Sequence, residues 1–349
     1  MIRRVLILGS IILMICLLGC GEDEMPMTVL GKYESGVFVI NQGKFGDGTG
    51  TVTYYDRDTT IIQNIYQTEN AGFVLGNIAQ SMQVANGNTY LAINNAAKIE
   101  VVDVNDFTRT TTIDGLAQVR YMITDEEENR LFASSWGTDG VSGVLYEINT
   151  ETNLIESQLE TGGGLENMVI DGTELYVTKS GGFGTDSTLI QYDLSRSVIE
   201  EEYIVGDNPV GIVKDNEDDI WVLCSGAFDF SNPTNNTAGG LYLIEGDNAI
   251  LQLELLNGSN NLVIDEVGNN LYYLDSEGIK VVDLTTLESS LFASGFYYAL
   301  GFDPKDRMLY ASDAKDFSSN GEALIFDRSG VEQNRIETGI IPGGFYFAN

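Results

Sequence analysis

The sequence predicts an all-β fold, a single seven-bladed β-propeller of four-stranded blades. Three features predict it: a strand motif that repeats seven times, a second strand pattern after every copy, and a terminal strand with no partner in its own repeat. Neighbouring copies of the first motif begin 38 to 53 residues apart. Such spacing suits one four-stranded blade per repeat.

The repeated strand motif is eight residues long and aligns without gaps in all seven copies. Its third position is apolar or aromatic in every copy. The copies are SGVFVINQ from Ser35, NTYLAINN from Asn88, NRLFASSW from Asn129, TELYVTKS from Thr173, DDIWVLCS from Asp218, NNLYYLDS from Asn269 and RMLYASDA from Arg307.

The second strand pattern follows a few residues later and ends on an apolar residue followed by an acidic residue or asparagine. Asp and Asn side chains accept hydrogen bonds from the backbone that follows them, so we expect these positions to start turns. A ring of catalytic acids is the alternative, but recurrence in every repeat favours turn chemistry. The positions are Asp56, Asp103, Asn149, Asp193, Glu245, Asp283 and Asp327.

A third motif precedes the eight-residue strand, and its seventh copy, GGFYFAN, ends the sequence. The first repeat has no such strand before it. We therefore expect the segment from Gly344 to Ala348 to pair with the segment from Gly36 to Ile40 and close the ring, which removes an exposed sheet edge. No helical periodicity follows Cys20, so residues 29–349 are predicted to form one propeller domain.

Residues 1–19 are predicted to be a signal peptide, because the apolar stretch from Val5 to Leu18 is short for a membrane span. Leu17-Leu18-Gly19-Cys20 resembles a bacterial lipobox, which implies that Cys20 is lipidated. An ordinary signal peptide with a chance cysteine is the alternative. Residues 20–28 then form a tether, and Gly21-Glu22-Asp23-Glu24 resembles the signal that sends lipoproteins of the Bacteroidetes to the cell surface. The expected location is the outer membrane, lipid-anchored and exposed at the cell surface.

The amino-acid composition excludes several classes of function. The chain has 18 basic and 52 acidic residues, and removing the two arginines of the signal peptide leaves 16 against 52, a net charge of −36. Such a surface repels phosphate backbones and anionic headgroups, which argues against nucleic-acid binding and against membrane binding other than through the lipid. Histidine is absent, which excludes Ser-His-Asp and Cys-His catalysis, His-ligated zinc and proximal-His haem. Calcium sites built from carboxylates or carbonyls stay open.

Cysteine usage excludes an internal disulfide framework, because Cys224 is the one cysteine of the mature chain besides Cys20. Cys224 lies within a strand motif and is predicted to be a small buried apolar side chain.

We expect function at the end of the ring where the connections into the inner strands and the loops between second and third strands lie together. Five of these loops are long, namely 41–50, 135–142, 180–187, 225–239 and 313–321. Loops that vary on a repeating scaffold usually carry binding residues. Each long loop carries an aromatic residue, and the inner connections add amides and tyrosines.

This mixture suits a sizeable ligand with amide or hydroxyl groups. For each aromatic, packing back onto its own loop is the alternative. No catalytic residue and no metal ligand is assigned. The predicted ligand-binding residues are Asn41, Gln42, Phe45, Gln80, Asn94, Arg120, Trp136, Asn167, Phe183, Phe228, Tyr297, Tyr298 and Phe317.

The segments VFVINQGKFGDGTGTVTYYD, from Val37 to Asp56, and IPGGFYF, from Ile341, resemble the YncE-like propeller lipoproteins of Bacteroidetes. The best understood branch of that group is the BtuG type, which captures cobalamin at the cell surface. The resemblance spans essentially the whole mature chain. It implies that the protein binds a corrinoid and passes it to a TonB-dependent outer-membrane transporter, with the corrinoid as ligand and without a resident cofactor.

Two other functions stay open. Some propeller lactonases work with a calcium ion held by Glu, Asn and Asp and need no histidine, and Glu166 with Asn167 is the nearest candidate for such a set. The third possibility is a surface protein for interaction or adhesion, with the acidic shell as its contact.

Overall fold

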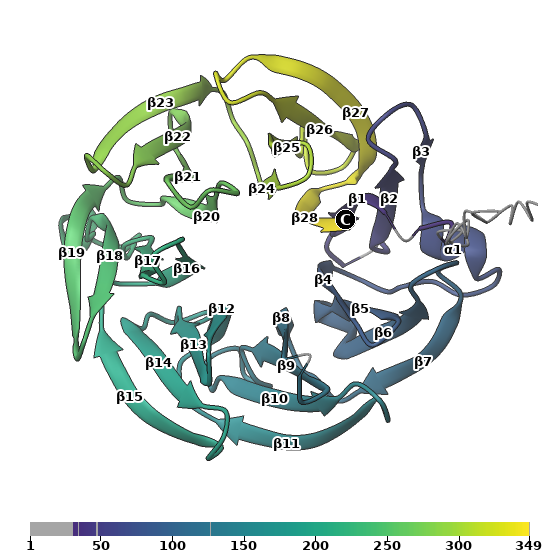
Figure 1. Ribbon diagram of the computed structural model, residues 1–349, viewed down its shortest axis with the longest axis horizontal. Coiled ribbons are helices and arrows are strands. Elements are labelled where there is room, and N and C mark those ends of the chain that lie inside the picture. Colours follow the sequence, from purple (N-terminus) through teal and green to yellow (C-terminus); the bar gives the residue numbers. More distant parts are fainter. Residues whose placement is uncertain (1–30, 34, 47, 126, 349) are drawn as a thin grey trace, which may run out of the picture.

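The computed structural model describes residues 31–33, 35–46, 48–125 and 127–348. Over these residues the chain forms seven antiparallel sheets of four strands each, which stand as blades around a central axis (Figure 1). The predicted fold class is thereby confirmed. The predicted signal peptide, Cys20 and the tether lie outside the described residues, as do residues 29, 30 and 349 of the predicted domain.

Each blade runs from an inner strand near the axis to an outer strand at the rim. Blade 1 contains β28 (Pro342–Ala348), β1 (Gly36–Asn41), β2 (Thr51–Tyr55) and β3 (Ile61–Ile62). Blade 2 contains β4 (Ala79–Ala85), β5 (Asn88–Ile93), β6 (Lys98–Asp103) and β7 (Arg109–Asp114). Blade 3 contains β8 (Val119–Asp125), β9 (Arg130–Ser135), β10 (Val144–Asn149) and β11 (Leu154–Glu160).

The remaining four blades repeat this order. Blade 4 contains β12 (Leu165–Asp171), β13 (Glu174–Lys179), β14 (Thr188–Asp193) and β15 (Val198–Ile204). Blade 5 contains β16 (Pro209–Lys214), β17 (Ile220–Cys224), β18 (Gly239–Glu245) and β19 (Asn248–Leu255). Blade 6 contains β20 (Asn260–Ile264), β21 (Asn270–Asp275), β22 (Gly278–Asp283) and β23 (Glu288–Ser294). Blade 7 contains β24 (Leu300–Asp303), β25 (Met308–Asp313), β26 (Asn320–Phe326) and β27 (Glu332–Ile340).

The ring closes as expected, through antiparallel pairing of β28 with β1. Gly36 pairs with Ala348 and Ile40 with Gly344, so the two segments that pair are those predicted from the sequence. Side chains also cross the closing seam between blades 7 and 1. Arg57, just after β2, donates from Nε to Oδ2 of Asp303 at 2.6 Å and from Nη2 to Oδ1 at 3.3 Å.

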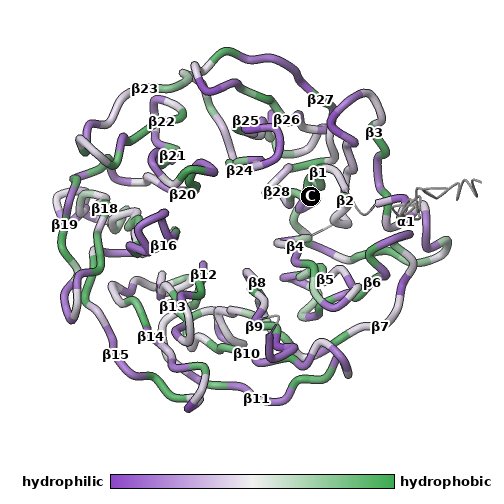
Figure 2. The backbone as a smooth tube through the Cα atoms, in the orientation of Figure 1, coloured by the Kyte–Doolittle hydropathy of each residue, from purple (hydrophilic) through white to green (hydrophobic). Residues whose placement is uncertain are grey.

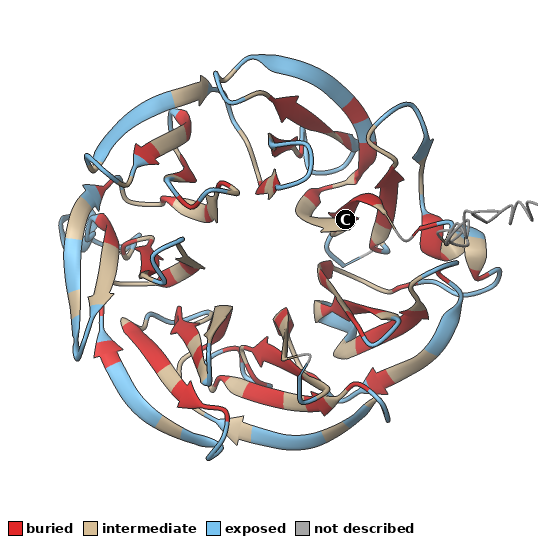
Figure 3. Cartoon of the chain, viewed as in Figure 1, coloured by how far each residue is buried: buried red, intermediate tan, exposed pale blue. Residues whose placement is uncertain are grey.

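The hydrophobic core is distributed over the seams between neighbouring blades. In the closing seam, Val37 and Val39 of β1 pack with Tyr310 of β25 and Ile325 of β26. Hydrophobic segments occur in every blade (Figure 2). Burial is greatest in the second strand of each blade, while the innermost strands are largely of intermediate burial and the outer strands are largely exposed (Figure 3). Each blade thus buries its two faces against its two neighbours, which stabilises the ring without disulfides.

Blade 2 departs by one residue from the ungapped alignment of the strand motif. Leu91 and Ile93 of β5 pack towards blade 1, whereas Tyr90 and Ala92 pack towards blade 3. In blade 3 it is the third motif residue, Leu131, that packs towards the preceding blade. Side chains alternate between the two faces of a strand, so a shift of one residue exchanges the two faces.

One short helix interrupts the strands, and it is compatible with the absence of helical periodicity in the sequence. The helix α1 (Ile65–Glu69) follows the two-residue outer strand β3, and buried Ile65 and Tyr66 pack into the seam between blades 1 and 2. Five residues are too few to show a helical repeat in the sequence. Two 3-10 turns, η1 (Asn94–Ala96) and η2 (Pro233–Asn235), lie in loops. Among the described residues no helix is long and apolar enough to cross a membrane.

Six of the seven residues that end the second strand pattern act as turn residues, as expected; the seventh, Glu245, pairs with Asn248 in the hairpin of β18 and β19. Oδ1 of Asp56 accepts hydrogen bonds from the backbone N–H groups of Asp58, Thr59 and Thr60. Comparable bonds reach the side chains of Asp103, Asn149, Asp193, Asp283 and Asp327.

Glu100 is a buried acid of β6 whose charge is stabilised by two cations. Lys98 Nζ lies 2.8 Å from its Oε2, and Arg109 Nε lies 2.5 Å from its Oε1. Burial by itself raises the pKa of Glu100, but the hydrogen bonds from Lys98 and Arg109 lower it overall. A lowered folded-state pKa stabilises the fold above the ordinary glutamate value of about 4.3, and this contribution disappears as pH falls through the folded-state pKa.

Glu100→Gln is therefore expected to reduce the free energy of unfolding at neutral pH by about 1–3 kcal/mol, because it removes a buried charged hydrogen-bond acceptor. The difference between the variant and the wild type should shrink as the pH falls through the lowered folded-state pKa of Glu100, since the carboxylate is then protonated. Urea unfolding at neutral pH and along an acid series measures this difference, with exposed Glu151→Gln as the control. A difference that persists in acid would mean that packing, not charge, is responsible.

Candidate functional site

One end of the ring carries the long loops. Successive strands run in opposite directions, so the loops between second and third strands lie at the same end as the connections into the inner strands. We call this end the mouth. A pocket of about 490 Å³ opens there beside the axis. Its lining includes Gln42, Gln80, Tyr121, Asn257, Asn260, Asn261, Phe296, Tyr297 and Tyr298.

Arg120 organises one side of the mouth. Its Nη1 donates to Oε1 of Gln80 at 2.8 Å, and its Nε donates to Oε2 of Glu166 at 3.2 Å. The guanidinium lies 4.3 Å from the ring centre of Trp136, whose Nε1 donates to Oε1 of Glu166 at 3.0 Å. Residues from blades 2, 3 and 4 therefore form one network, which we call the mouth network: Gln80, Arg120, Trp136 and Glu166.

The mouth network holds a matched pair of charges. Burial alone lowers the pKa of Arg120, but Glu166 raises it and the net shift is upward, so the guanidinium stays charged. Burial raises the pKa of Tyr121, and the Glu166 carboxylate raises it further, so the phenol stays neutral. The side chains of Arg120 and Glu166 are 17% and 7% exposed. The mouth network is therefore polar, with its two charges paired to each other.

The opposite side of the mouth is built from amides and a tyrosine. The hydroxyl of Tyr298 donates to Oε1 of Gln42 at 3.0 Å, which joins blade 7 to blade 1. Asn261 donates from Nδ2 to the Tyr298 carbonyl at 3.2 Å. Gly343 makes room for Gln42, because a Cβ there would lie 2.5 Å from its Nε2.

Two smaller cavities lie next to the mouth pocket, with volumes of about 310 and 140 Å³. Tyr121 and Gly343 line all three spaces. The cavity of about 140 Å³ is also lined by Met82, Met122 and Met168, and we call it the methionine chamber.

The structure places the predicted amide and basic residues unequally. Gln42 and Gln80 line the mouth pocket, and Arg120 contacts Gln80. Asn167 lines both smaller cavities and donates to the carbonyl of Val210 at 2.7 Å. The side chain of Asn94 donates to the carbonyl of Val119 at 3.0 Å.

Asn41 does not reach the mouth pocket. Its side chain is fully buried, its Nδ2 donates to the hydroxyls of Thr51 and Thr53, and its Oδ1 accepts from the backbone N–H of Gly339. The amide joins strands of blades 1 and 7, so we assign Asn41 to the closing seam and leave it out of the proposed site. The sequence pattern placed it at a strand end, where burial could not be read.

The predicted aromatic residues divide into pairs. The Trp136 and Phe183 rings meet edge to face at 5.2 Å between centres, Tyr298 and Phe317 do so at 5.6 Å, and Phe228 stacks on Phe230 at 6.0 Å. Trp136 with Phe183 and Tyr298 with Phe317 each join two loops. Tyr297 lines the mouth pocket, while Phe45 is 73% exposed on its loop.

Sequence reasoning missed Tyr121, Asn257, Asn261 and Phe296 of the mouth pocket. Tyr121 follows Arg120 directly, and strand alternation predicts that only one of two successive residues faces the axis. The register shifts between Val119 and Met122, however, and similar shifts occur near the start of β4, β12, β16 and β20. Such bulges change the direction of neighbouring side chains. Because alternation excludes the neighbour of Arg120 unless a bulge is present, no local pattern in the sequence marks Tyr121.

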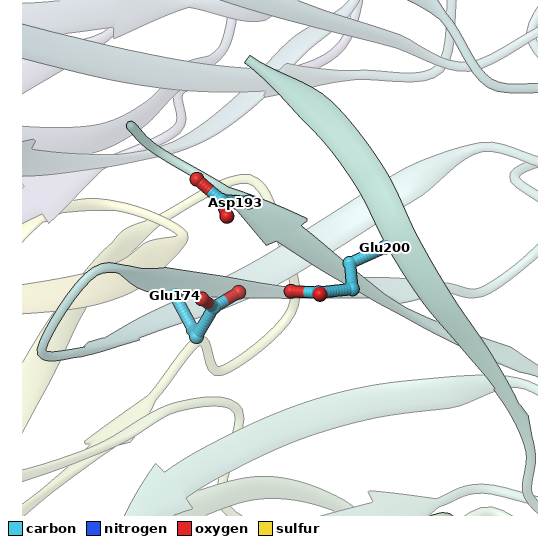
Figure 4. Close-up of side chains that lie close together, drawn as sticks. All are labelled: Glu174, Asp193 and Glu200. Carbon is cyan, nitrogen blue, oxygen red and sulfur yellow. The ribbon is translucent and has the colours of Figure 1, made fainter. Parts of the chain in front are cut away.

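Three carboxylates far from the mouth also lie close together. Oxygen atoms of Glu174, Asp193 and Glu200 in blade 4 are within 4.8 Å of one another (Figure 4). Glu174 begins β13 and Asp193 ends β14, which places both at the end of the ring opposite the mouth. Asp193 already pairs with Arg196, with 2.5 Å between Oδ2 and Nε. We therefore assign the cluster to turn and surface chemistry.

A family model for a domain of unknown function, DUF5074, matches residues 35–325. The chain belongs to this family. The match covers nearly all of the propeller, including the residues of the mouth network. No curated protein matches the DUF5074 chain at a significant level.

Solved structures share the fold of this DUF5074 chain. A quinonprotein alcohol dehydrogenase-like protein from Bacteroides thetaiotaomicron VPI-5482 is 15% identical with a TM-score of 0.67, over 91% of this chain and 79% of that one. Hydrazine synthase of Kuenenia stuttgartiensis is 13% identical with a TM-score of 0.61, over 78% and 92%. A functionally unknown protein from Desulfotomaculum acetoxidans DSM 771 is 12% identical with a TM-score of 0.64, over 90% and 99%. At these identities the likeness concerns the fold alone.

Proposed function

We propose that the mouth pocket binds a small molecule that is neutral overall and rich in amide or hydroxyl groups. The observation that carries this proposal is the lining: a pocket of about 490 Å³ with five amide side chains and three tyrosines. Amides both donate and accept hydrogen bonds, and tyrosine adds flat apolar surface with a polar end. The paired charges of Arg120 and Glu166 leave no uncompensated cation there to attract an anionic ligand.

A corrinoid such as cobalamin is the ligand that we favour. Its periphery carries amides that match Gln42, Asn257 and Asn260, and its ring faces match the aromatic rings beside the pocket. A ligand of this size would extend from the pocket over the loops, where Phe228 and Phe296 are 55% and 70% exposed. Residues 37–56 resemble the propeller lipoproteins of Bacteroidetes as a group, and the choice of a corrinoid follows the best understood branch of that group.

Capture and delivery at the cell surface complete the proposal. With Cys20 lipidated, the propeller would be held at the outer membrane and would hand its ligand to a TonB-dependent transporter. The acidic composition is consistent with attachment through the lipid, because such a surface does not bind anionic headgroups by itself.

The geometry favours binding over the calcium-dependent hydrolase considered above. Both carboxylate oxygens of Glu166 receive hydrogen bonds, one from Arg120 and one from Trp136. Asn167 donates its amide to the carbonyl of Val210. A calcium site built on these two residues would therefore have to displace a cation and an indole first.

The test mixes the purified protein with cyanocobalamin and follows the visible absorbance of the corrinoid through gel filtration. We expect the absorbance to elute with the protein at micromolar concentration. Tyr298→Ala is expected to weaken binding by about tenfold, the effect of about 1.4 kcal/mol, because it removes a flat surface and frees Gln42. Tyr242→Ala, which lies away from the mouth pocket, is the control. Elution of cyanocobalamin apart from the wild-type protein would refute the corrinoid proposal.

A further inference from the structure

The methionine chamber lies on the axis of the ring, next to the polar mouth pocket. Met82, Met122 and Met168 line it together with Phe345. The part of the chain that the structure describes contains four methionines, and three of them border this one cavity of about 140 Å³. The three methionines belong to the inner strands β4, β8 and β12, and none of them lies in a loop of the mouth.

The three methionines occupy equivalent places in successive inner strands. Met82 of β4, Met122 of β8 and Met168 of β12 each pack into the seam with the preceding blade. In blades 5, 6 and 7 the residues at the same place are Ile212, Leu262 and Leu300. The position carries an apolar side chain in each of these blades, and methionine occurs in three of the four blades that border the chamber. Methionine is flexible and polarisable, and it recurs on surfaces that adapt to varied apolar ligands.

Three polar groups of the chamber are engaged by the protein. The hydroxyl of Ser81 donates to the Arg120 carbonyl at 2.7 Å, and the amide of Asn167 donates to the Val210 carbonyl at 2.7 Å. Oε1 of Gln80 accepts from Arg120. With these groups partnered, the methionine and Phe345 side chains are the part of the lining that suits an apolar guest. The volume of the chamber is close to that of an apolar cavity of about 150 Å³ that binds benzene.

Tyr121 lines both the chamber and the mouth pocket, and the two spaces also share Gln80 and Gly343 as lining residues. On the blade 1 side, Gly343 and Gly344 occupy positions where blade 3 carries Arg120 and Tyr121. The missing side chains leave open space next to Tyr121. A Cβ at Gly344 would have one neighbour within 4 Å, the carbonyl oxygen of Gln80 at 3.8 Å.

From this arrangement we infer that the methionine chamber is a second subsite, which takes an apolar ring or alkyl group of the ligand whose polar part occupies the mouth pocket. The inference rests on the proposed function and adds to it that the ligand is amphipathic. Tyr121 is then the residue that sets how deep the ligand reaches.

The chamber can be filled without altering the mouth pocket. Gly344 lines both smaller cavities but not the mouth pocket, so Gly344→Leu would occupy the chamber with a side chain. Met168→Gln keeps the length of the side chain and makes the wall polar. Phe296→Ala changes the mouth pocket alone and is the matched control.

Fluorobenzene, a neutral probe of benzene size, tests the chamber by fluorine NMR of the full purified protein. We expect saturable line broadening with the wild type and with Phe296→Ala, and binding weaker by about tenfold or more with Gly344→Leu and by several-fold with Met168→Gln. The inference would be overturned if the wild type showed no broadening. It would also be overturned if both chamber variants bound fluorobenzene as tightly as the wild type does. Met168→Gln keeps the test decisive if Gly344→Leu does not fold.

The same variants, tested with cyanocobalamin, separate this inference from the proposed function. Suppose that the wild type binds fluorobenzene, that Gly344→Leu abolishes this binding, and that the wild type does not bind cyanocobalamin. This result supports the apolar subsite and refutes the corrinoid. Cyanocobalamin binding without fluorobenzene binding refutes the subsite and supports the corrinoid.

Discussion

Arg57→Met is expected to lower the free energy of unfolding by about 3–5 kcal/mol, the cost of leaving a buried charge without its partner. The Asp303 side chain is fully buried and that of Arg57 is 7% exposed. The two residues belong to blades 7 and 1, so the pair spans the seam that closes the ring. Urea unfolding at neutral pH, followed by tryptophan fluorescence, measures the loss.

A double-mutant cycle separates the charge from the packing at this seam. Asp303→Asn keeps the oxygen that accepts from the backbone N–H of Lys305 and removes the charge. We expect Arg57→Met combined with Asp303→Asn to be more stable than Arg57→Met alone, because removing both charges of a buried pair costs less than removing one. The exposed Arg196→Met is the control and should leave the unfolding midpoint nearly unchanged. A double variant as unstable as the single one would show that the loss is one of packing.

Glu166→Gln is expected to weaken cyanocobalamin binding by about tenfold, if the mouth binds a corrinoid as proposed. The substitution keeps an acceptor for Trp136 but removes the charge that pairs with Arg120. Without this charge, the Arg120 guanidinium is held less firmly against Trp136 and Gln80. Ordering each such side chain on binding costs about 0.5–1.5 kcal/mol, and about 1.4 kcal/mol corresponds to a factor of ten.

The double variant, Arg120→Met combined with Glu166→Gln, is compared with Glu166→Gln alone. It removes both charges, so a neutral ligand should bind it better than Glu166→Gln alone, because no uncompensated cation remains in the mouth. Titration calorimetry with cyanocobalamin gives the affinities, and unfolding midpoints show whether the fold is intact. Equal affinity of the wild type and Glu166→Gln would mean that the mouth network does not contribute to binding.

Local sequence patterns were enough to predict the blades and the closure of the ring. Each strand motif shows an alternation of apolar residues within its own few residues. The terminal strand has no partner in its own repeat, and one free strand edge is left for it to pair with. Asp56 could be recognised as a turn residue because its hydrogen bonds stay within four residues of it. The one-residue offset of blade 2 escaped detection, since both faces of β5 are apolar.

By itself, the sequence determined the seven-bladed ring, the strand that closes it, and which end carries the variable loops, because all three follow from a repeat and its period. Only the tertiary structure decided how the candidate site is composed. Gln80, Arg120 and Glu166 lie 40 and 46 residues apart and meet because three neighbouring blades converge on one axis. The bulges that turn Tyr121 towards that axis, and the glycines of β28 that leave space beside it, act through packing between blades. Contacts of this kind have no local signature, so a repeat can predict the scaffold without predicting what its centre holds.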